Sequence, residues 1–461
     1  MPDSRNAAGE ADNPLTIALV VDSVGNRGNG TSNSALQYAK ELERQGHHVR
    51  LVGVGAPDYP VEVHHLPFVS WLAAKQQMQF AQPDDVVFRR AFEDVDAVHI
   101  YMPFKFGRRA LAIARSMGIP VTAGFHLQPE NVTYSAGPLR YIPGIPSLIY
   151  YLFDFWLYRH VGHIHTPSQM IARQLRAHGY HARLHVISNG YSSRFHPAQA
   201  ESNNEEDDEC DQHSRTSADI RTLDGGISER HNSDLAGVDK DDSAEIVVQD
   251  SHGTRPMFSK RRVSLAAAPE VQDSHGSQRA FRIIASGRLT HEKDHETLIR
   301  AIALSKHASQ IDLTICGTGP LQFRLRRLAR RLLPRPAHIG FHANEDMPNL
   351  LRQADLLVHP SIVDIESLSV LEGIASGLVP VIADSPLSAA SQFALTDSSV
   401  SPARNAKALA RRIDWWIEHP QERAQWGPRY AQEAREKYAL PQCVRQFVVM
   451  EREAIADARR Q

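Results

Sequence analysis

Two carboxylates eight residues apart frame the segment of the chain that is richest in potential chemistry. Asp364 and Glu372 stand at the ends of the run Asp-Ile-Glu-Ser-Leu-Ser-Val-Leu-Glu. Gly377 and the apolar run Val379 to Ala383, which is typical of a buried strand, follow it. We therefore expect a helix to begin near Ser367, with the first acid in the loop before it and the second acid in its second turn.

The start of such a helix is suited to a phosphate group. The first N–H groups of a helix have no partner within it, and the helix dipole places positive charge at this end. Here these donors would belong to Ser367, Leu368 and Ser369. Flanking acids suit sugar hydroxyls, which need acceptors, and Glu366 is a second candidate for that contact. An amphipathic helix with two solvated acids is the alternative that this segment alone leaves open.

Two cations follow an apolar run upstream of this segment. Phe281 to Ser286 predicts a buried strand, and a glycine, Arg288 and Lys293 come after it. A guanidinium group can donate a forked pair of hydrogen bonds to a phosphate, and an ammonium group adds a point charge. A lone Arg/Lys pair is usually solvated, but the position of this pair before the acidic helix favours a diphosphate site.

Together these segments resemble the donor-binding half of retaining GT-B glycosyltransferases of family 4, which use nucleotide sugars. The resemblance implies that Asp364 binds the donor sugar, that the helix start binds the diphosphate and that Glu372 binds the ribose. It also implies that Arg288 and Lys293 neutralise the leaving diphosphate, so that no metal ion and no other cofactor is needed. The donor would be a UDP-hexose, and the sugar would be transferred with retention of configuration.

The sequence departs from the family pattern at several of these positions. Asp364 replaces the usual Glu, and Glu366 is an additional acid. Ser367 and Asp294 each stand where the family commonly has Gly. These departures concern the contact with the donor sugar more than the contact with the diphosphate.

Other turns in the second half are weaker candidates for substrate binding. Gly317 and Gly319 end a further apolar run, although many strand-to-helix turns need Gly for backbone reasons alone. Phe341 follows the next predicted strand, and in the family a loop of this kind touches the nucleotide base.

The first half begins with an apolar run, Leu15 to Asp22, followed by a loop rich in glycine and a predicted helix, Thr31 to Gln45. Further strand-like runs follow, so the pattern predicts a doubly wound α/β domain, although the loop lacks the Gly-x-Gly-x-x-Gly fingerprint. Gly30 would let the backbone approach the diphosphate, and a plain turn is the alternative.

One histidine of the first half stands where this architecture places function. His126 comes just after an apolar run that ends at Gly124, and loops at strand ends carry function in such domains. In similar enzymes a histidine here lies beside the donor sugar. Glu130 and Asn131 are candidates for contact with the acceptor. A loop histidine satisfied by backbone groups is the alternative for His126.

The predicted architecture is α/β: two Rossmann-like doubly wound domains that face each other across a cleft, the GT-B arrangement. We expect an N-terminal acceptor domain in 1–197, a disordered acidic insertion in 198–279, a donor-nucleotide domain in 280–430, and a C-terminal helix in 431–461 that packs back on the first domain. The insertion is polar and carries the acidic run 205–209, so it cannot bury enough apolar area to offset its ordering entropy.

Composition limits the partners. The chain has 461 residues with 51 Lys and Arg against 53 Asp and Glu, a balance that gives no support for nucleic acid as a partner. Its three cysteines show no metal or disulfide spacing.

With neither a signal-like start nor a run of roughly 20 apolar residues, we expect a cytoplasmic protein. The basic stretch Leu321 to Leu333 and the aromatic stretch Tyr141 to Tyr158 are candidates for peripheral contact with the inner face of a membrane.

The acceptor is not specified by any of these patterns, and lipid, glycan and small-molecule acceptors are all open. Two other functions are compatible with the fold and the donor site. One is a GT-B-like sugar-nucleotide epimerase, which would need further acid/base groups in the cleft. The other is a non-enzymatic nucleotide-sugar-binding or scaffold protein.

Overall fold

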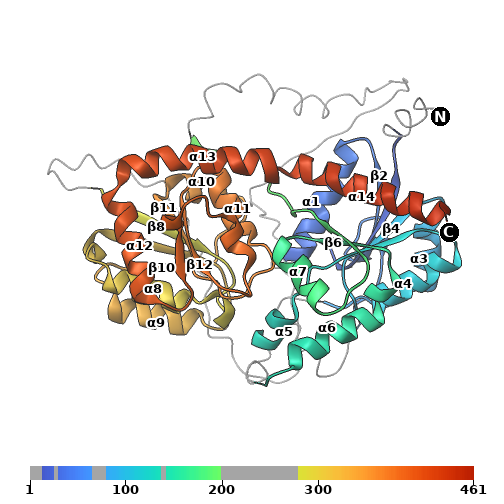
Figure 1. Cartoon of the computed structure of the whole chain (residues 1–461), viewed down its shortest axis with the longest axis horizontal. Coiled ribbons are helices and arrows are strands. Elements are labelled where there is room, and N and C mark those ends of the chain that lie inside the picture. Colours follow the sequence, from blue (N-terminus) through green and yellow to red (C-terminus); the bar gives the residue numbers. More distant parts are fainter. Residues whose placement is uncertain (1–12, 25–29, 65–78, 136–141, 199–278, 461) are drawn as a thin grey trace, which may run out of the picture. The chain divides into compact units, whose positions relative to one another are not determined.

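The structure is a computed structural model that describes residues 13–24, 30–64, 79–135, 142–198 and 279–460 (Figure 1). The insertion predicted at 198–279 lies outside the described residues, except for Ala198 and Arg279. The described residues build two parallel sheets.

The first sheet contains seven strands in the order β3-β2-β1-β4-β5-β6-β7, and every paired neighbour is parallel. This order reverses direction at β1 and β4, as in a doubly wound fold. The strands are β1 (Thr16–Ser23), β2 (His48–Val54), β3 (Tyr59–Pro60), β4 (Ala97–Ile100), β5 (Val121–Gly124), β6 (His163–Thr166) and β7 (Arg183–Val186).

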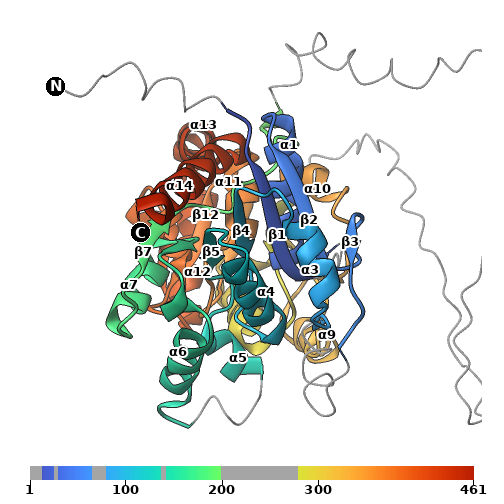
Figure 2. The ribbon, with the colours of Figure 1, turned by 90° about the vertical axis from the view of Figure 1, so that its right-hand side faces the viewer.

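Helices cover both faces of this sheet, which explains why the central strands β1, β4 and β5 are buried along nearly their whole length. One core receives buried side chains from α3, α4, α6 and α7, and another from α1. Figure 2 shows α3 and α4 in front of the sheet. The helices are α1 (Gly30–Arg44), α3 (Asp85–Phe92), α4 (Lys105–Ser116), α5 (Pro129–Ser135), α6 (Ile145–Trp156) and α7 (Gln169–Ala177).

The second sheet repeats the plan with six parallel strands in the order β10-β9-β8-β11-β12-β13. Its strands are β8 (Phe281–Ser286), β9 (Ile311–Cys316), β10 (His338–Gly340), β11 (Leu356–His359), β12 (Pro380–Asp384) and β13 (Val400–Pro402). Its helices are α8 (His295–Leu304), α9 (Gln322–Leu332), α10 (Met347–Gln353), α11 (Leu368–Ala375) and α12 (Ala406–Glu418). The predicted α/β class with two Rossmann-like domains is therefore confirmed.

Two long helices, α13 (Pro420–Tyr438) and α14 (Leu440–Arg460), end the chain. The boundary predicted at residue 431 falls inside α13, and the helix that returns to the first domain begins at Leu440. There its apolar face, with Val444 and Phe447, joins the core beneath β1 and α1 (Figure 1).

The chain passes between the two domains near Tyr191 and again near Ala439, and these two segments are hydrogen-bonded to each other. Tyr191 N donates to Tyr438 O at 3.2 Å, and Leu440 N donates to Tyr191 O at 3.2 Å. Tyr191 and Phe195 already belong to the core of the second domain, so the first domain ends a few residues before the predicted limit at 197.

Candidate active site

A cavity of about 320 Å³ is lined by residues from both domains. Its lining residues follow the carboxyl ends of β1, β4, β5 and β7 in the first sheet and of β8 and β11 in the second. These strands include the central pairs β1/β4 and β8/β11, at which the strand order reverses and where open α/β sheets bind ligands. The predicted residues that line it are Gly30, His126, Asn131, Arg288, Lys293, Asp364, Glu366, Ser367, Leu368 and Ser369.

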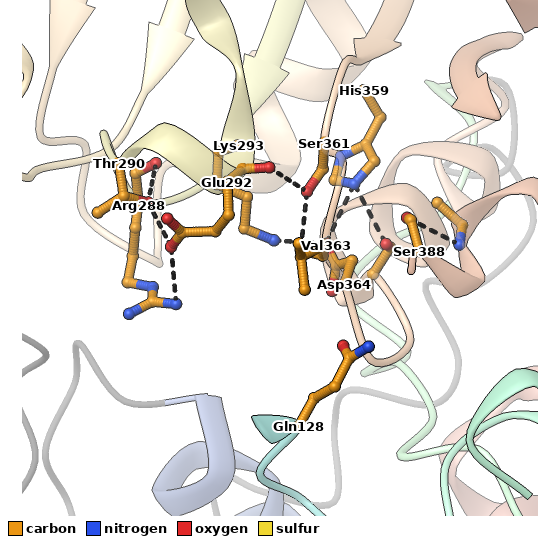
Figure 3. Close-up of polar contacts among 12 residues, drawn as sticks. Gln128, Arg288, Thr290, Glu292, Lys293, His359, Ser361, Val363, Asp364 and Ser388 are labelled. Atoms are coloured by element: carbon orange, nitrogen blue, oxygen red, sulfur yellow. Dashed lines mark hydrogen bonds and ion pairs between the residues drawn. The ribbon is translucent and has the colours of Figure 1, made fainter. Parts of the chain in front are cut away.

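Arg288 is held at the cavity by a buried acid. Its Nη2 lies 3.2 Å from Oε1 of Glu292, whose side chain is 1% exposed (Figure 3). The same oxygen accepts a hydrogen bond of 2.6 Å from Thr290 Oγ1. Because the guanidinium remains one-third exposed, it can still donate to a ligand that enters the cavity.

Lys293 and Asp364 form a largely buried ion pair through Nζ and Oδ2 (Figure 3). His359, at the end of β11, places Nε2 3.1 Å from the same carboxylate oxygen and 3.1 Å from Ser367 Oγ. Burial alone would raise the pKa of Asp364, but the Lys293 ammonium and His359 outweigh it and hold that pKa well below its ordinary value. An ionised carboxylate only accepts hydrogen bonds, so His359 carries its proton on Nε2.

Burial favours the neutral form of His359. Burial, with a further contribution from Lys293, lowers the pKa of His359 although Asp364 opposes this shift. The cavity therefore presents two cations, Arg288 and Lys293, and one ionised acid.

The two positions where the sequence replaces a family glycine have left-handed backbones. Ser367, the residue before α11, has φ of +80°, and Asp294, before α8, has φ of +46°. A residue with a side chain pays roughly 1–2 kcal/mol for this conformation. Hydrogen bonds accompany it at both places: Ser367 Oγ lies near His359, and Asp294 accepts from Thr297 Oγ1 at 2.7 Å.

Helix α11 begins at Leu368, as expected, and the residues at its start, Ser367, Leu368 and Ser369, line the cavity. The first backbone bonds that return to Ser367 O come from Val370 and Leu371. The N–H groups before Val370 are thus the donors that a phosphate would use.

Glu366 joins the two domains. Its buried carboxylate accepts hydrogen bonds from Ser188 Oγ, from Asn189 N at 3.0 Å, and from the Asn189 side-chain amide. Burial raises the pKa of Glu366 to about 7, although these donors oppose the shift. Ser168 Oγ adds a bond of 2.8 Å to Ile365 O. Glu366 thus has partners in the first domain, whereas Asp364 is paired with the catalytic lysine candidate.

On the first-domain side, Gly30 begins α1 and lines the cavity together with His126 and Asn131. The His126 ring stacks on Tyr101, with ring centroids 4.9 Å apart. Glu130 does not line the cavity; Tyr150 donates a hydrogen bond to it at 3.2 Å, and burial raises its pKa.

Four predicted residues of the second domain lie outside the cavity lining. A Cβ at Gly317 would lie 1.9 Å from Gly287 O, and one at Gly319 would lie 2.5 Å from Leu289 O. These glycines therefore allow two turns to pack together beside Arg288.

Phe341 is 71% exposed. Glu372 is half-buried in the second turn of α11, where burial raises its pKa to about 7 against the effect of Arg194.

The sequence interpretation missed four residues that support the site: Glu292, His359, Ser188 and Asn189. Asn189 lines the cavity itself, although the Asn-Gly pair suggests only a turn. Glu292 had a usable signal, because it stands four residues after Arg288. His359 had none, because it ends an apolar strand.

Comparison with known proteins agrees with this geometry. A model of "Glycosyltransferase Family 4" matches residues 28–194, and a model of "Glycosyl transferases group 1" matches residues 269–433. A GDP-mannose-dependent α-mannosyltransferase of Corynebacterium glutamicum is 23% identical over 80% of this chain and 72% of its own length. An α-monoglucosyldiacylglycerol synthase of Streptococcus pneumoniae is 22% identical over 80% of this chain and 71% of its own.

Solved structures share the fold at low identity. Sucrose-phosphate synthase of Thermosynechococcus elongatus superposes with a TM-score of 0.62 at 14% identity, covering 96% of this chain and 100% of that one. Anabaena Alr3699/HepE in complex with UDP and glucose gives 0.58 at 14%, covering 94% and 98%. Fold and cavity thus define a two-domain enzyme of the GT-B class. The chain belongs to the family 4 type of GT-B glycosyltransferases.

Proposed function

We propose that this glycosyltransferase moves a hexose from a UDP-sugar to a lipid acceptor with retention of configuration. The observation that carries the donor assignment is the meeting of Arg288, Lys293 and the start of α11 at one cavity. Two cations and a set of free N–H groups form a complementary site for a diphosphate. Retention is consistent with the family, and the UDP complex of the Anabaena structure supports the choice of nucleotide.

In this mechanism the protein stabilises charge on the leaving diphosphate. Arg288 donates its free N–H groups, and Lys293 turns from Asp364 toward the phosphate oxygens as negative charge develops there. These cations take the place of a metal ion at the diphosphate. Asp364 then accepts hydrogen bonds from the donor hydroxyls, while Glu372 meets the ribose when the nucleotide is bound. His126 lies beside the sugar from the first domain.

On the acceptor side, Asn131 lines the cavity near the N-terminal end of α5, and its neighbour Glu130 would reach the acceptor only after leaving the hydrogen bond from Tyr150. Because the acceptor lies between the domains, water is excluded when they close, and transfer is favoured over hydrolysis. The exposed Phe341 is placed to contact the nucleotide base only if its loop moves toward the cavity.

The lipid assignment rests on α6. No helix among the described residues is long and apolar enough to cross a bilayer. Helix α6, however, exposes Leu148, Tyr151, Phe155 and Trp156, each by 39% or more. Arg159, which pairs with Asp154 at 2.9 Å, also stacks over the rings of Tyr151 and Phe155, with its guanidinium carbon 5.8 and 5.0 Å from their centroids. Aromatic side chains beside a cation suit the headgroup region of a membrane, here its cytoplasmic face.

The basic helix α9 is a weaker membrane candidate than its sequence suggests. Arg324 pairs with Glu296, and Arg326 donates to Ile339 O at 2.8 Å. These two cations are therefore engaged within the second domain.

We expect the Tyr151→Ser/Phe155→Ser double variant to bind vesicles of anionic phospholipid at least about tenfold more weakly than the wild type, since each aromatic side chain contributes up to roughly 1.5–3 kcal/mol when buried. Sedimentation with vesicles measures this partition. Val449→Ser, which alters a side chain on α14 that is 55% exposed, is the matched control and should bind like the wild type. Equal binding by the double variant would exclude α6 as the membrane face.

A single assay tests the donor assignment. The protein is incubated with each UDP-hexose or with GDP-mannose, in the presence of diacylglycerol vesicles, and free nucleotide and sugar products are followed. The proposal is supported if a donor with an α-linked sugar yields both free UDP and an α-linked glycoside of the acceptor. Release of GDP alone, an inverted product, or conversion of the sugar nucleotide without transfer would each contradict it.

A further inference from the structure

Three histidines from neighbouring strands of the first sheet converge. His99 lies in β4, His165 lies in β6, and His126 follows β5 between them. One nitrogen of each ring lies within 4.8 Å of the other two. The sheet register causes this, because His99 pairs with Thr122 and His165 pairs with Gly124 on the strand between them.

Each ring has one buried nitrogen without a hydrogen-bond partner among the described residues. These atoms are His99 Nε2, His126 Nε2 and His165 Nδ1. A buried polar atom that is left unpaired costs about 1–3 kcal/mol. Three such atoms gathered in one place indicate that something else occupies the space between them.

The partners of the other nitrogens fix two of the three rings in the form that ligates a cation. His165 Nε2 lies 2.8 Å from Ile187 O, which only accepts, so Nε2 carries the proton and Nδ1 has a free lone pair. Thr122 Oγ1 donates to Glu451 Oε1 at 2.7 Å, so it accepts from His99 Nδ1 at 2.7 Å. His99 Nε2 is therefore also a lone pair.

Two lone pairs that face the same space repel each other, and the single ring proton of His126 can satisfy only one of them. Protonation of two of these rings is disfavoured. Burial lowers the pKa of His165 to about 3, and burial together with the two other rings lowers the pKa of His126 well below its ordinary value. Both rings therefore favour the neutral form in which imidazoles bind metal ions.

Gly124 keeps the space open. A Cβ at this position would lie 2.3 Å from His126 Nε2 and 3.1 Å from His99 Nε2. The absence of a side chain here is what allows the rings to approach.

We propose that His99, His126 and His165 bind one divalent transition-metal ion of the zinc class. Three imidazoles with a fourth position left open are a common set for such an ion. A carboxylate that orients a ligating histidine is its usual outer support, and Glu451 of α14 does this for His99, which it approaches to 3.2 Å. Tetrahedral bonds of zinc length place nitrogens roughly 3.4 Å apart, so small ring rotations complete the site.

The ion would be held by the first domain alone, and it is therefore separate from Arg288 and Lys293. His126 belongs both to this cluster and to the lining of the cavity, so bound metal would fix a ring that faces the substrates. A second group, His163, His185 and Glu453, provides a comparison. There both nitrogens of His163 are already engaged, with His185 and with Asp457, each at 3.0 Å.

To test the proposal, the full-length protein is treated with a chelator and then titrated with Co²⁺ or Zn²⁺. Binding is measured by calorimetry and, for Co²⁺, by its visible absorption. We expect His165→Gln to lose one equivalent of binding, and Glu451→Gln to weaken that equivalent about 10–100-fold. His185→Gln should bind like the wild type. Melting curves establish whether each variant is folded. If His165→Gln does not fold, the isosteric Glu451→Gln variant tests the proposal in its place.

Absence of saturable binding by the wild type would overturn the proposal, because the space would then hold only water. Loss of the equivalent in His185→Gln, with full binding in His165→Gln and Glu451→Gln, would overturn it as well and would place the metal at the second group.

Discussion

Replacing Lys293 with methionine is expected to lower kcat/KM for sugar transfer about 10²–10³-fold, because a positioned cation that meets developing charge has an effect of this size. The same change leaves the buried Asp364 carboxylate without its ammonium partner. Removal of one member of a buried pair costs about 3–5 kcal/mol, so the melting temperature should fall too.

The two effects can be separated with one further substitution. Lys293→Met combined with Asp364→Asn should recover stability, since no unpaired charge remains, but it should not recover transfer. Lys306→Met is the control, because Lys306 forms an exposed ion pair with Glu418 and is itself 61% exposed. If Lys293→Met transfers sugar as fast as this control, Lys293 has no part in catalysis.

Glu366→Ala is expected to destabilise the protein by about 3–5 kcal/mol, because the donors of Ser188 and Asn189 lose their acceptor within a buried contact. For domains of this size that corresponds to a fall of roughly 10 °C in melting temperature. Transfer should also weaken, since this contact holds the start of α11 against the first domain.

Glu366→Gln keeps one acceptor oxygen and should lose less stability. Glu433→Ala, which removes the partly exposed partner of the exposed Lys437, is the control and should shift the melting temperature by little. Normal stability of Glu366→Ala combined with abolished transfer would mean that this acid holds the donor sugar and that Asp364 does not.

Much of the fold can be predicted from the sequence because central strands of a parallel sheet are buried on both faces. The apolar run Phe281 to Ser286 is β8 without change, and the run Leu15 to Asp22 is β1 with both ends moved by one residue. The boundary of the last helix was placed too early, inside α13, because α13 and α14 are separated by a single residue, Ala439. The one signal of the break is Pro441, the second residue of α14, since proline is favoured in the first turn of a helix.

The sequence motifs correctly predicted which residues meet where those residues directly follow the ends of strands. Arg288, Lys293 and Asp364 meet because they follow strands that are neighbours in one sheet. Contacts such as Glu366 with Asn189 join residues 177 positions apart in the sequence and depend on how two domains pack. No periodicity or spacing encodes that, so Ser188 and Asn189 were missed, although Asn189 lines the cavity.

The departures from the family glycines also have a physical explanation that the sequence alone does not give. Only backbone angles reveal that Ser367 and Asp294 occupy left-handed positions, where glycine is free of strain. We infer that the local hydrogen bonds of both residues offset part of that strain.

Titration calorimetry of UDP into the wild type and Arg288→Ala tests the central claim, that this cavity binds the donor diphosphate. Loss of one charge-assisted hydrogen-bonding group costs about 1.5–3 kcal/mol. We therefore expect UDP to bind the variant roughly 10–150-fold more weakly, with uridine, which lacks phosphate, little affected. Equal affinity of UDP for both proteins would contradict the assignment of the site.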